Sequence, residues 1–210
     1  MIKAIIFDID GVLVNTFEAN LKFYQGLLAR NGYTEPSREE YKVQFHLAMI
    51  DAIKFFTKSN DEAEIQKIFT MGADRKHSYP FELVTSPEHM KETIGYLSQK
   101  YILGIVTNKI RQNVFEIPQL KEVEGYFQEV ISVNDTIKHK PDPEPLLLIL
   151  QRLNISVDEA VYIGDSKTDL QAARSAGMKF ILFPTSDIND FDATTDIFSQ
   201  LPDVIKKLEK

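Results

Sequence analysis

The amino-acid sequence predicts an α/β fold: a doubly wound, mostly parallel sheet of the Rossmann type, with a small α-helical domain inserted into it. Short apolar segments alternate with helical patterns along most of the chain, which is typical of parallel α/β sheets. One long stretch, residues 17–79, interrupts this alternation and carries helical patterns alone. A chain of 210 residues has room for one main domain with a small insert.

The predicted strands are short runs rich in Ile and Val that are bounded by Gly, Asp or Asn. Most of them are almost continuously apolar, as expected for strands whose two faces are both buried in a parallel sheet. They span residues 3–7, 101–106, 129–133, 160–163 and 179–183.

Helices are predicted between these strands. Ser86 followed by Pro87 is a start signal, because serine caps a helix and proline favours its first position. Residues 143–153 and 167–176 also show helical periodicity, and Gly177 is a typical stop signal after the second of them.

The inserted stretch shows three successive segments with apolar side chains at helical spacing. The three sets are Phe17, Leu21, Tyr24 and Leu28; Phe45, Met49, Ala52 and Phe56; and Ile65, Ile68 and Phe69. Such a segment has the size of a small helical bundle. We therefore predict two domains: an α/β core of residues 1–15 and 81–210, and a helical cap of residues 16–80.

The composition restricts the partners of the chain. The formal net charge of −7 disfavours binding to the phosphate backbone of nucleic acids. The absence of cysteine excludes disulfides, thiolate nucleophiles and cysteine-bound zinc. The apolar runs are too short to cross a bilayer, and Asp8 interrupts the first one too early for a signal peptide. We therefore expect a soluble, cytoplasmic protein with no nucleic-acid or membrane partner, for which a monomer is plausible.

Two carboxylates follow the first predicted strand directly. If the chain stays extended past Phe7, Asp8 and Asp10 point the same way, and Gly11 then allows a sharp turn. Two carboxylates in one small volume repel each other, and a hard divalent cation is the simplest group that offsets them. Taken alone, the pair is at least as typical of a solvated turn.

Polar residues follow other strands as well. Thr107 and Asn108 come after 101–106, Lys140 lies beyond 129–133, and Asp165 and Asp169 follow 160–163. Each group has an ordinary alternative, such as a polar turn, a surface charge or a helix cap. Ligands of open parallel sheets bind beyond the carboxyl ends of the strands. Together, in this order, the residues therefore predict a site for a metal ion and a phosphoryl group.

Four segments carry a resemblance to a known family. As an ordered set, they resemble the four motifs of the haloacid dehalogenase-like phosphohydrolase superfamily. The segments are Asp8-Ile-Asp-Gly-Val-Leu-Val-Asn-Thr16, Ile105-Val-Thr-Asn108, Lys140-Pro-Asp-Pro-Glu-Pro145 and Gly164-Asp-Ser-Lys-Thr-Asp169. The two acids of the first motif resemble the phosphoryl-transfer members rather than the dehalogenases.

The resemblance implies roles for the first motif and the metal. Asp8 would be the nucleophile that forms an aspartyl-phosphate, and Asp10 would be the general acid and base. Mg²⁺ would be held by the Asp8 carboxylate, the Asp10 backbone carbonyl and Asp165, with Asp169 in support. The substrate would be a small phosphorylated metabolite.

It also implies roles for the remaining motifs. Thr107 and Asn108 would bind the transferring phosphoryl group, and Lys140 would pair with Asp8 and the phosphoryl oxygens. Asn15 departs from the family pattern, where Asp is frequent, which we expect to affect the hinge of the cap rather than the chemistry.

The position of the insert resembles the branch of the family whose helical cap follows the first motif. That branch includes phosphoglycolate phosphatase, a pyrophosphatase and β-phosphoglucomutase. A phosphoglycolate-like monoester phosphatase is the favoured function; an inorganic pyrophosphatase or a β-phosphoglucomutase-like enzyme are alternatives. Residues 44–47 stand where many members have a Gly-containing substrate loop, so Gln44 and His46 are the candidate substrate-selecting residues.

Two readings outside this branch stay open. A receiver-type signalling module also combines acids, Thr and Lys on a doubly wound sheet, but it would need neither the helical insert nor the acids at 165 and 169. A catalytically inactive interaction protein is disfavoured, because every core motif position is filled.

Overall fold

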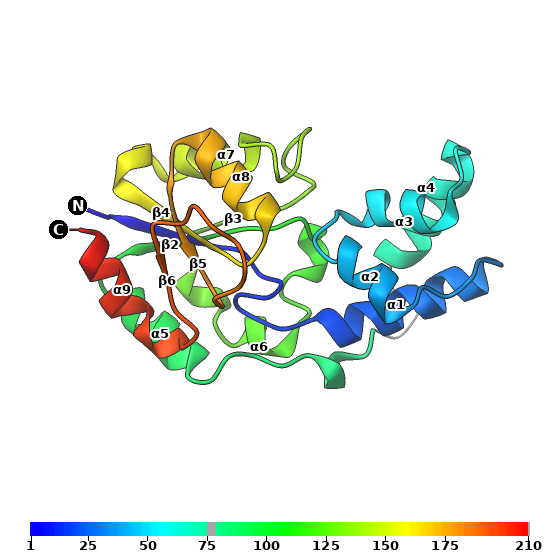
Figure 1. Cartoon of the computed structure of the whole chain (residues 1–210), viewed down its shortest axis with the longest axis horizontal. Helices are drawn as coiled ribbons and strands as arrows, with labels where there is room; N and C mark the ends of the chain where they lie inside the picture. The colour runs from blue at the N-terminus through cyan, green and yellow to red at the C-terminus, as the bar shows by residue number, and fades with distance from the viewer. Residues whose placement is uncertain (75–78, 210) are drawn as a thin grey trace.

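The computed structural model describes residues 1–74 and 79–209. Within these residues, six strands form one parallel sheet in the order β3-β2-β1-β4-β5-β6 (Figure 1). The strands are β1 (Ala4–Phe7), β2 (Ile102–Val106), β3 (Glu129–Ile131), β4 (Ala160–Gly164), β5 (Lys179–Leu182) and β6 (Ala193–Thr194). The five predicted strands and the parallel α/β class are thereby confirmed.

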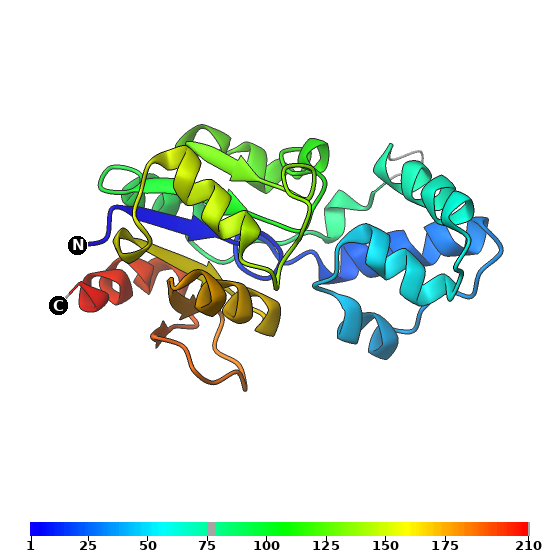
Figure 2. The same cartoon turned by 90° about the horizontal axis from the view of Figure 1, so that it is seen from above.

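Helices cover both faces of this sheet, as predicted for a doubly wound fold (Figures 1 and 2). One face packs against α5 (Met90–Leu97), α6 (Pro118–Lys121) and α9 (Leu201–Leu208). The other packs against α7 (Glu144–Leu153) and α8 (Lys167–Ala176). The residues of β1 and β4 are fully buried, which explains their continuous apolar sequence.

The cap lies beyond one end of the sheet and is entirely helical in its described part (Figure 2). Its helices are α1 (Phe17–Arg30), α2 (Arg38–Gln44), α3 (Met49–Thr57) and α4 (Glu62–Ala73). Aromatic rings fill its interior: Tyr41 lies 5.5 Å from Tyr24 and 6.3 Å from Phe56 between ring centroids. Aromatic pairs of this kind stabilise the packing of the cap helices against one another.

The second predicted cap helix is wrong in one respect. Phe45 was predicted on the same helical face as Met49, but α2 ends at Gln44 and α3 begins at Met49. The intervening residues 45–48 form a turn, which packs the Phe45 ring 5.2 Å from that of Phe17. Packing between helices, rather than helical periodicity, therefore decides the course of this segment.

A second correction concerns the start of α5. The signal at Ser86 and Pro87 predicts a helix beginning there, but α5 begins at Met90, after His89 in the left-handed conformation. Thr85 forms an antiparallel bridge with Asn15, with backbone N–H···O distances of 2.8 and 3.2 Å. We infer that this bridge, which joins the two connections to the cap, keeps the chain extended and delays the helix.

Shorter elements complete the fold. Strand β6 was not predicted, because its two residues are too few to show a pattern. The 3₁₀ helices are η1 (Phe81–Leu83), η2 (Arg111–Asn113), η3 (Glu124–Tyr126), η4 (Val157–Glu159) and η5 (Phe198–Gln200). No helix among the described residues combines the length and the apolar character that a membrane span requires.

Candidate active site

The register of the sheet brings the sequence motifs to one edge. Phe7, the last residue of β1, is level with Ile105 of β2 and Ile163 of β4. The residues that follow these strands therefore start from neighbouring positions. Asp8 continues the pairing, because its backbone N–H donates to the Ile163 carbonyl at 2.9 Å. Thr107 likewise donates its backbone N–H to Ile131 at 3.0 Å.

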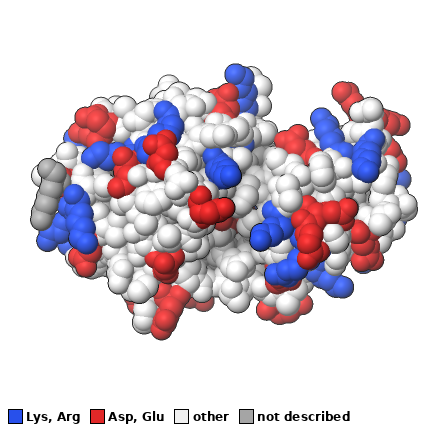
Figure 3. Space-filling model, in the orientation of Figure 1, with Lys and Arg blue, Asp and Glu red and all other residues white. Residues whose placement is uncertain are grey.

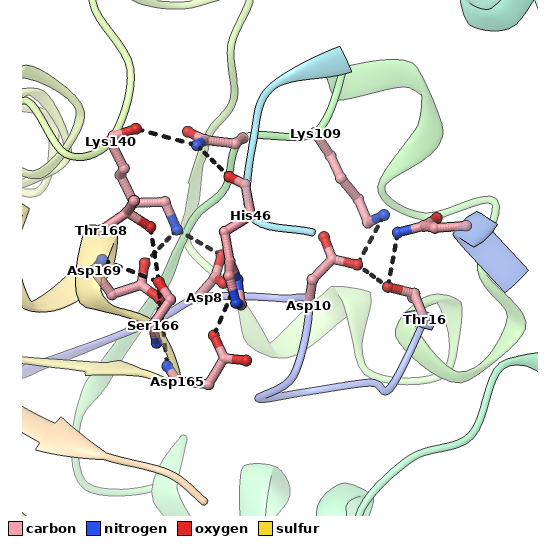
Figure 4. A network of polar contacts seen from close by, with 12 residues as sticks. Asp8, Asp10, Thr16, His46, Lys109, Lys140, Asp165, Ser166, Thr168 and Asp169 are labelled. Carbon is pink, nitrogen blue, oxygen red and sulfur yellow. Dashed lines mark hydrogen bonds and ion pairs between the residues drawn. The ribbon is translucent and has the colours of Figure 1, made fainter. Parts of the chain in front are cut away.

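Lys140 is the central cation of this edge (Figure 4). Its ammonium lies 2.8 Å from Asp8 Oδ1 and 2.6 Å from Asp169 Oδ1, and it also donates to the Tyr162 hydroxyl at 2.9 Å. The Lys140 side chain is only 3% exposed. A buried ammonium in such contacts is fixed in place, because two carboxylates and a hydroxyl hold it and moving away would leave its charge unpaired. The structure thus brings together Asp8, Lys140 and Asp169, as the motifs suggested.

Helix α8 positions the last acid of the set. Ser166 caps this helix by accepting a hydrogen bond from the backbone N–H of Asp169 at 3.1 Å. The Asp169 carboxylate also accepts hydrogen bonds from Tyr162 and Ser166. These contacts leave Asp169 buried and aimed at Lys140, so it orients the lysine.

The pKa values of these acids are shifted in different directions, although burial raises all three. It raises the pKa of Asp8 to about 7, although Lys140 opposes the effect. It also raises the pKa of Asp165 well above its usual range, with help from the charges of Asp169 and Asp8. Asp169 is equally buried, but the charge and hydrogen bonds of Lys140 outweigh burial and hold its pKa below the usual value. A raised pKa means that the ionised form is disfavoured, so Lys140 by itself does not offset three ionised carboxylates.

The acidic cluster has the chemistry of a divalent-cation site. Oxygen atoms of Asp8, Asp165 and Asp169 lie within 4.8 Å of one another. Asp165 Oδ1 is buried and has no hydrogen-bond partner among the described residues. A buried carboxylate oxygen without a donor is costly, and a hard cation with oxygen ligands would satisfy it. The residues present therefore fit Mg²⁺.

Gly11 lets the first motif approach this cluster closely. Its backbone φ is +86°, and a Cβ atom placed there would lie 1.8 Å from Asp165 Oδ2. No L-residue with a side chain fits this position without moving Asp165. The glycine after the two acids is therefore needed for the site and not only for the turn.

Asp10 points to a different set of partners from Asp8 (Figure 4). Its Oδ1 atom accepts a hydrogen bond from the Thr16 hydroxyl and lies 3.0 Å from Lys109 Nζ. Its side chain is not part of the carboxylate cluster formed by Asp8, Asp165 and Asp169. That placement agrees with a metal contact through the Asp10 backbone carbonyl alone, which stays a prediction.

The two predicted phosphate-binding residues, Thr107 and Asn108, make different contacts. The Thr107 hydroxyl is buried and accepts the backbone N–H of Lys109 at 3.2 Å, so its own hydrogen can be donated to a ligand. Asn108 Nδ2 donates to the backbone carbonyl of His46 at 3.2 Å and to that of Lys140 at 3.3 Å. Asn108 therefore joins the cap to the core in this structure, and its role toward phosphate stays a prediction.

A cavity of about 70 Å³ lies between the sheet edge and the cap. Asp8, Asp10 and Lys140 line it from the core, and cap residues that include Tyr24, Tyr41, Phe45, His46 and Met49 line it from the other side. In the space-filling view, the two lobes meet at a narrowing, and acidic and basic side chains are interspersed over that face (Figure 3).

The two candidate selecting residues differ in their placement. His46 lines the cavity, with Nδ1 3.7 Å from Asp165 Oδ1, and its burial lowers its pKa. Gln44 is the last residue of α2 and is not among the residues that line the cavity. The structure thus brings His46, and not Gln44, to the candidate site.

Sequence reasoning missed Lys109, Thr16 and Tyr162. Lys109 directly follows the Thr107–Asn108 pair, which was a usable signal for its position. Tyr162 lies in the middle of a buried strand, where its hydroxyl has no sequence pattern of its own. Thr16 was noted only as the end of the first motif, and its contact with Asp10 depends on the turn between them.

Comparisons with known proteins agree with this geometry. Residues 5–183 match the model of the haloacid dehalogenase-like hydrolase family. A Bacillus cereus protein named pyrophosphatase PpaX is 33% identical over 180 residues, which cover 85% of this chain and 81% of the relative.

Two solved structures extend the comparison. A superfamily hydrolase of subfamily IA from Geobacter sulfurreducens is 27% identical, with a TM-score of 0.73 and coverage of 97% of this chain and 96% of that one. A candidate phosphoglycolate phosphatase from Lactobacillus plantarum is 25% identical, with a TM-score of 0.85 and coverage of 97% and 99%. The resemblance seen in the four motifs is thereby confirmed, and the chain belongs to the haloacid dehalogenase-like hydrolases.

Proposed function

We propose that this protein is a Mg²⁺-dependent phosphatase that hydrolyses a small, phosphoglycolate-like phosphate monoester through an aspartyl-phosphate on Asp8. The observation that carries the proposal is the set formed under the cap by the buried Asp8, Lys140 and Asp169 and the partly buried Asp165. A nucleophile held against a cation, beside a cluster suited to a metal, is what phosphoryl transfer requires. The substrate would be a small cytoplasmic metabolite.

The protein's own residues account for both half-reactions. An Asp8 oxygen attacks phosphorus, so that a new O–P bond forms while the bond from phosphorus to the leaving oxygen breaks. Asp10 gives its proton to that leaving oxygen. Asp10 then takes a proton from the water that attacks the aspartyl-phosphate, which releases inorganic phosphate, restores the Asp8 carboxylate and returns Asp10 to its protonated form.

Other residues hold the transferring group during these steps. The Thr107 hydroxyl and groups at Asn108 bind phosphoryl oxygens, and Lys140 offsets the negative charge near Asp8. Asp8, the backbone carbonyl of Asp10 and Asp165 would hold Mg²⁺. When bound, the ion supplies positive charge that lets an anionic nucleophile and an anionic phosphoryl group approach each other.

The cavity lining bears on the substrate. Asp8, Asp10, Lys109 and Lys140 line it from the core, and His46 lines it from the cap. A phosphorylated substrate between them would have its phosphoryl group next to Asp8 and its leaving group on the side of the cap. A receiver-like module is disfavoured, because the acids 165 and 169 and the cap would then have no task.

Inorganic pyrophosphate is the second candidate substrate. It is favoured by the relative named pyrophosphatase PpaX, which matches most of this chain. Pyrophosphate is small, and its hydrolysis would use the same nucleophile, acid and metal.

The experiment that tests the proposal is phosphate release from a panel of phosphoglycolate, pyrophosphate, sugar phosphates and nucleotides. We expect repeated turnover of a small substrate with Mg²⁺, and loss of that turnover in excess chelator until Mg²⁺ is added back. Full activity in excess chelator would contradict the metal assignment. A single phosphorylation of the protein without turnover would favour the receiver-like alternative.

A further inference from the structure

A second lysine, Lys109, reaches the same cavity as Lys140. The two lysines lie on opposite sides of the pair formed by Asp8 and Asp10. Figure 4 shows Lys140 on the side of Asp8 and Lys109 on the side of Asp10. Both line the cavity. They are therefore positioned to contact different parts of a substrate that lies between the nucleophile and the general acid.

Lys140 has no capacity left for the leaving group. Its ammonium is hydrogen-bonded to Asp8, Asp169 and the Tyr162 hydroxyl, with the Val106 carbonyl at 3.4 Å. An ammonium has three hydrogens to donate, and these partners lie in the core. These contacts therefore hold Lys140 next to Asp8, where its charge lies near the transferring phosphoryl group, and away from the leaving group.

Lys109 is committed to a single contact. Among the described residues, its ammonium has one partner, Asp10, at 3.0 Å. Its side chain is 14% exposed, so it lies largely out of bulk water. Two of its three hydrogens are thus available to an acceptor in the cavity.

The backbone of Lys109 is fixed at both ends of the residue. Its N–H donates to the Thr107 hydroxyl at 3.2 Å, and its carbonyl accepts from Val133 at 3.2 Å. The side chain therefore starts from a position set by β2 and the loop after β3, and not by the cap. An ammonium that is already in place binds an anion without a large cost of ordering.

We propose that Lys109 binds an anionic group carried by the leaving group, and so selects substrates with a negative charge next to the bridging oxygen. The leaving oxygen must lie within hydrogen-bonding distance of Asp10, and the ammonium that contacts the same carboxylate is then beside it. The second phosphoryl group of pyrophosphate and the carboxylate of phosphoglycolate share this chemistry. The inference rests on the proposed function and narrows its substrate class.

The test compares Lys109→Gln with Lys109→Arg and with the surface control Lys121→Gln. Glutamine can still donate a hydrogen bond to Asp10 but carries no charge, whereas arginine keeps the charge. Lys121 is 64% exposed and pairs with Glu124 away from the cavity. Each variant is assayed with phosphoglycolate and pyrophosphate, and with ethyl phosphate as the substrate whose leaving group is neutral.

For Lys109→Gln, we expect kcat/KM with the two anionic substrates to fall roughly 10- to 100-fold, while that with ethyl phosphate falls less than about threefold. Lys109→Arg should keep most of the preference, and Lys121→Gln should match the wild type. A loss that is equal for all substrates would overturn the proposal, because Lys109 would then only position Asp10. If kcat/KM of Lys109→Gln equals that of the wild type for every substrate, the proposal is overturned as well.

A binding measurement decides the question without turnover. With Mg²⁺ present, calorimetry of inorganic phosphate, methylenediphosphonate and phosphonoacetate compares the wild type with Lys109→Gln. We expect the Kd of a probe with the second anionic group to rise by about tenfold or more, and that of inorganic phosphate to stay constant. The probe that loses more affinity identifies which anion the site prefers. If Lys109→Gln binds every probe as tightly as the wild type does, the proposal is overturned. If the wild type binds these probes but hydrolyses no substrate, the proposed function fails and not the assignment of Lys109.

Discussion

The sheet edge and the cap face the same cavity with different kinds of side chains. At the sheet edge, buried charges hold one another: the Lys140 side chain is 3% exposed and contacts Asp8 and Asp169 within 2.8 Å. The cap instead presents aromatic rings and His46, whose side chain is 33% exposed. The edge thus tolerates little change, because each charge depends on its neighbours.

Side chains of the core reach the cap through backbone carbonyls, from Asn108 to His46 and from Gln112 to Ala73. The Asn108 side chain reaches from the core to the His46 backbone carbonyl, so this contact does not depend on the identity of residue 46. We infer that the core determines the reaction and that the cap adjusts which substrates enter. The predictions below test this division, from the largest expected effect to the smallest.

The first prediction removes the nucleophile. Asp8→Asn keeps the shape of the side chain but removes its charge, so turnover should fall at least about a thousandfold for every substrate. Phosphate release measures the loss, and circular dichroism checks that the fold is kept. Substantial residual activity in a folded variant would mean that the reaction does not pass through an aspartyl-phosphate.

The second prediction removes the central cation. Lys140→Ala leaves Asp8 and Asp169 without a buried partner, so we expect kcat to fall about 100- to 1,000-fold for all substrates alike. The free energy of unfolding should fall by about 3–5 kcal/mol, measured by denaturant titration. Lys121→Ala is the matched control, since that side chain is 64% exposed. If kcat falls for some substrates only, the inference that the core determines the reaction and the cap selects the substrate is wrong.

The third prediction concerns pH in the metal-free protein. Burial raises the pKa of Asp8 to about 7, so the folded chain keeps a proton that the unfolded chain releases above about pH 4. The unfolded state then binds fewer protons, and the contribution of Asp8 to stability is lost as pH rises from about 4 to about 7. The thermal midpoint should fall over this range in wild type more than in Asp8→Asn.

The fourth prediction concerns the effect of Mg²⁺ on the pH dependence of stability. Binding at the acid cluster should favour the ionised carboxylates, so the ion should stabilise the fold more at pH 8 than at pH 5. At a metal concentration of 100 times Kd, the expected gain is about 2.7 kcal/mol. An equal gain at both pH values would place the bound ion away from Asp8.

The smallest expected effect lies in the cap. His46 lines the cavity and Gln44 does not, so His46→Ala should shift the ratio of kcat/KM between two substrates by about three- to tenfold. Gln44→Ala is the control from the neighbouring helix end and should leave that ratio unchanged. Equal scaling of every substrate by His46→Ala would show that residue 46 is not a selector.

Much of the core could be read from the sequence for a physical reason. Strands buried on both faces are continuously apolar, and parallel strands end at the same edge of their sheet. The placement of Asp8, Thr107 and Asp165 at neighbouring positions therefore follows from where each apolar run stops. The position of Gly11 after two acids also predicted a sharp turn. Its close approach to Asp165 could not be predicted from the sequence.

Only the tertiary structure decided how these groups are partnered. The turn between α2 and α3, the late start of α5 and the tie from Asn108 to His46 all depend on contacts between segments distant in sequence. The same holds for Lys109 beside Asp10 and for the Tyr162 hydroxyl beside Lys140. The local sequence shows which residues are apolar and where a helix or strand can begin. The direction of a polar side chain depends on the partner that satisfies its charge or hydrogen bond, and that partner is in place only after the chain has folded.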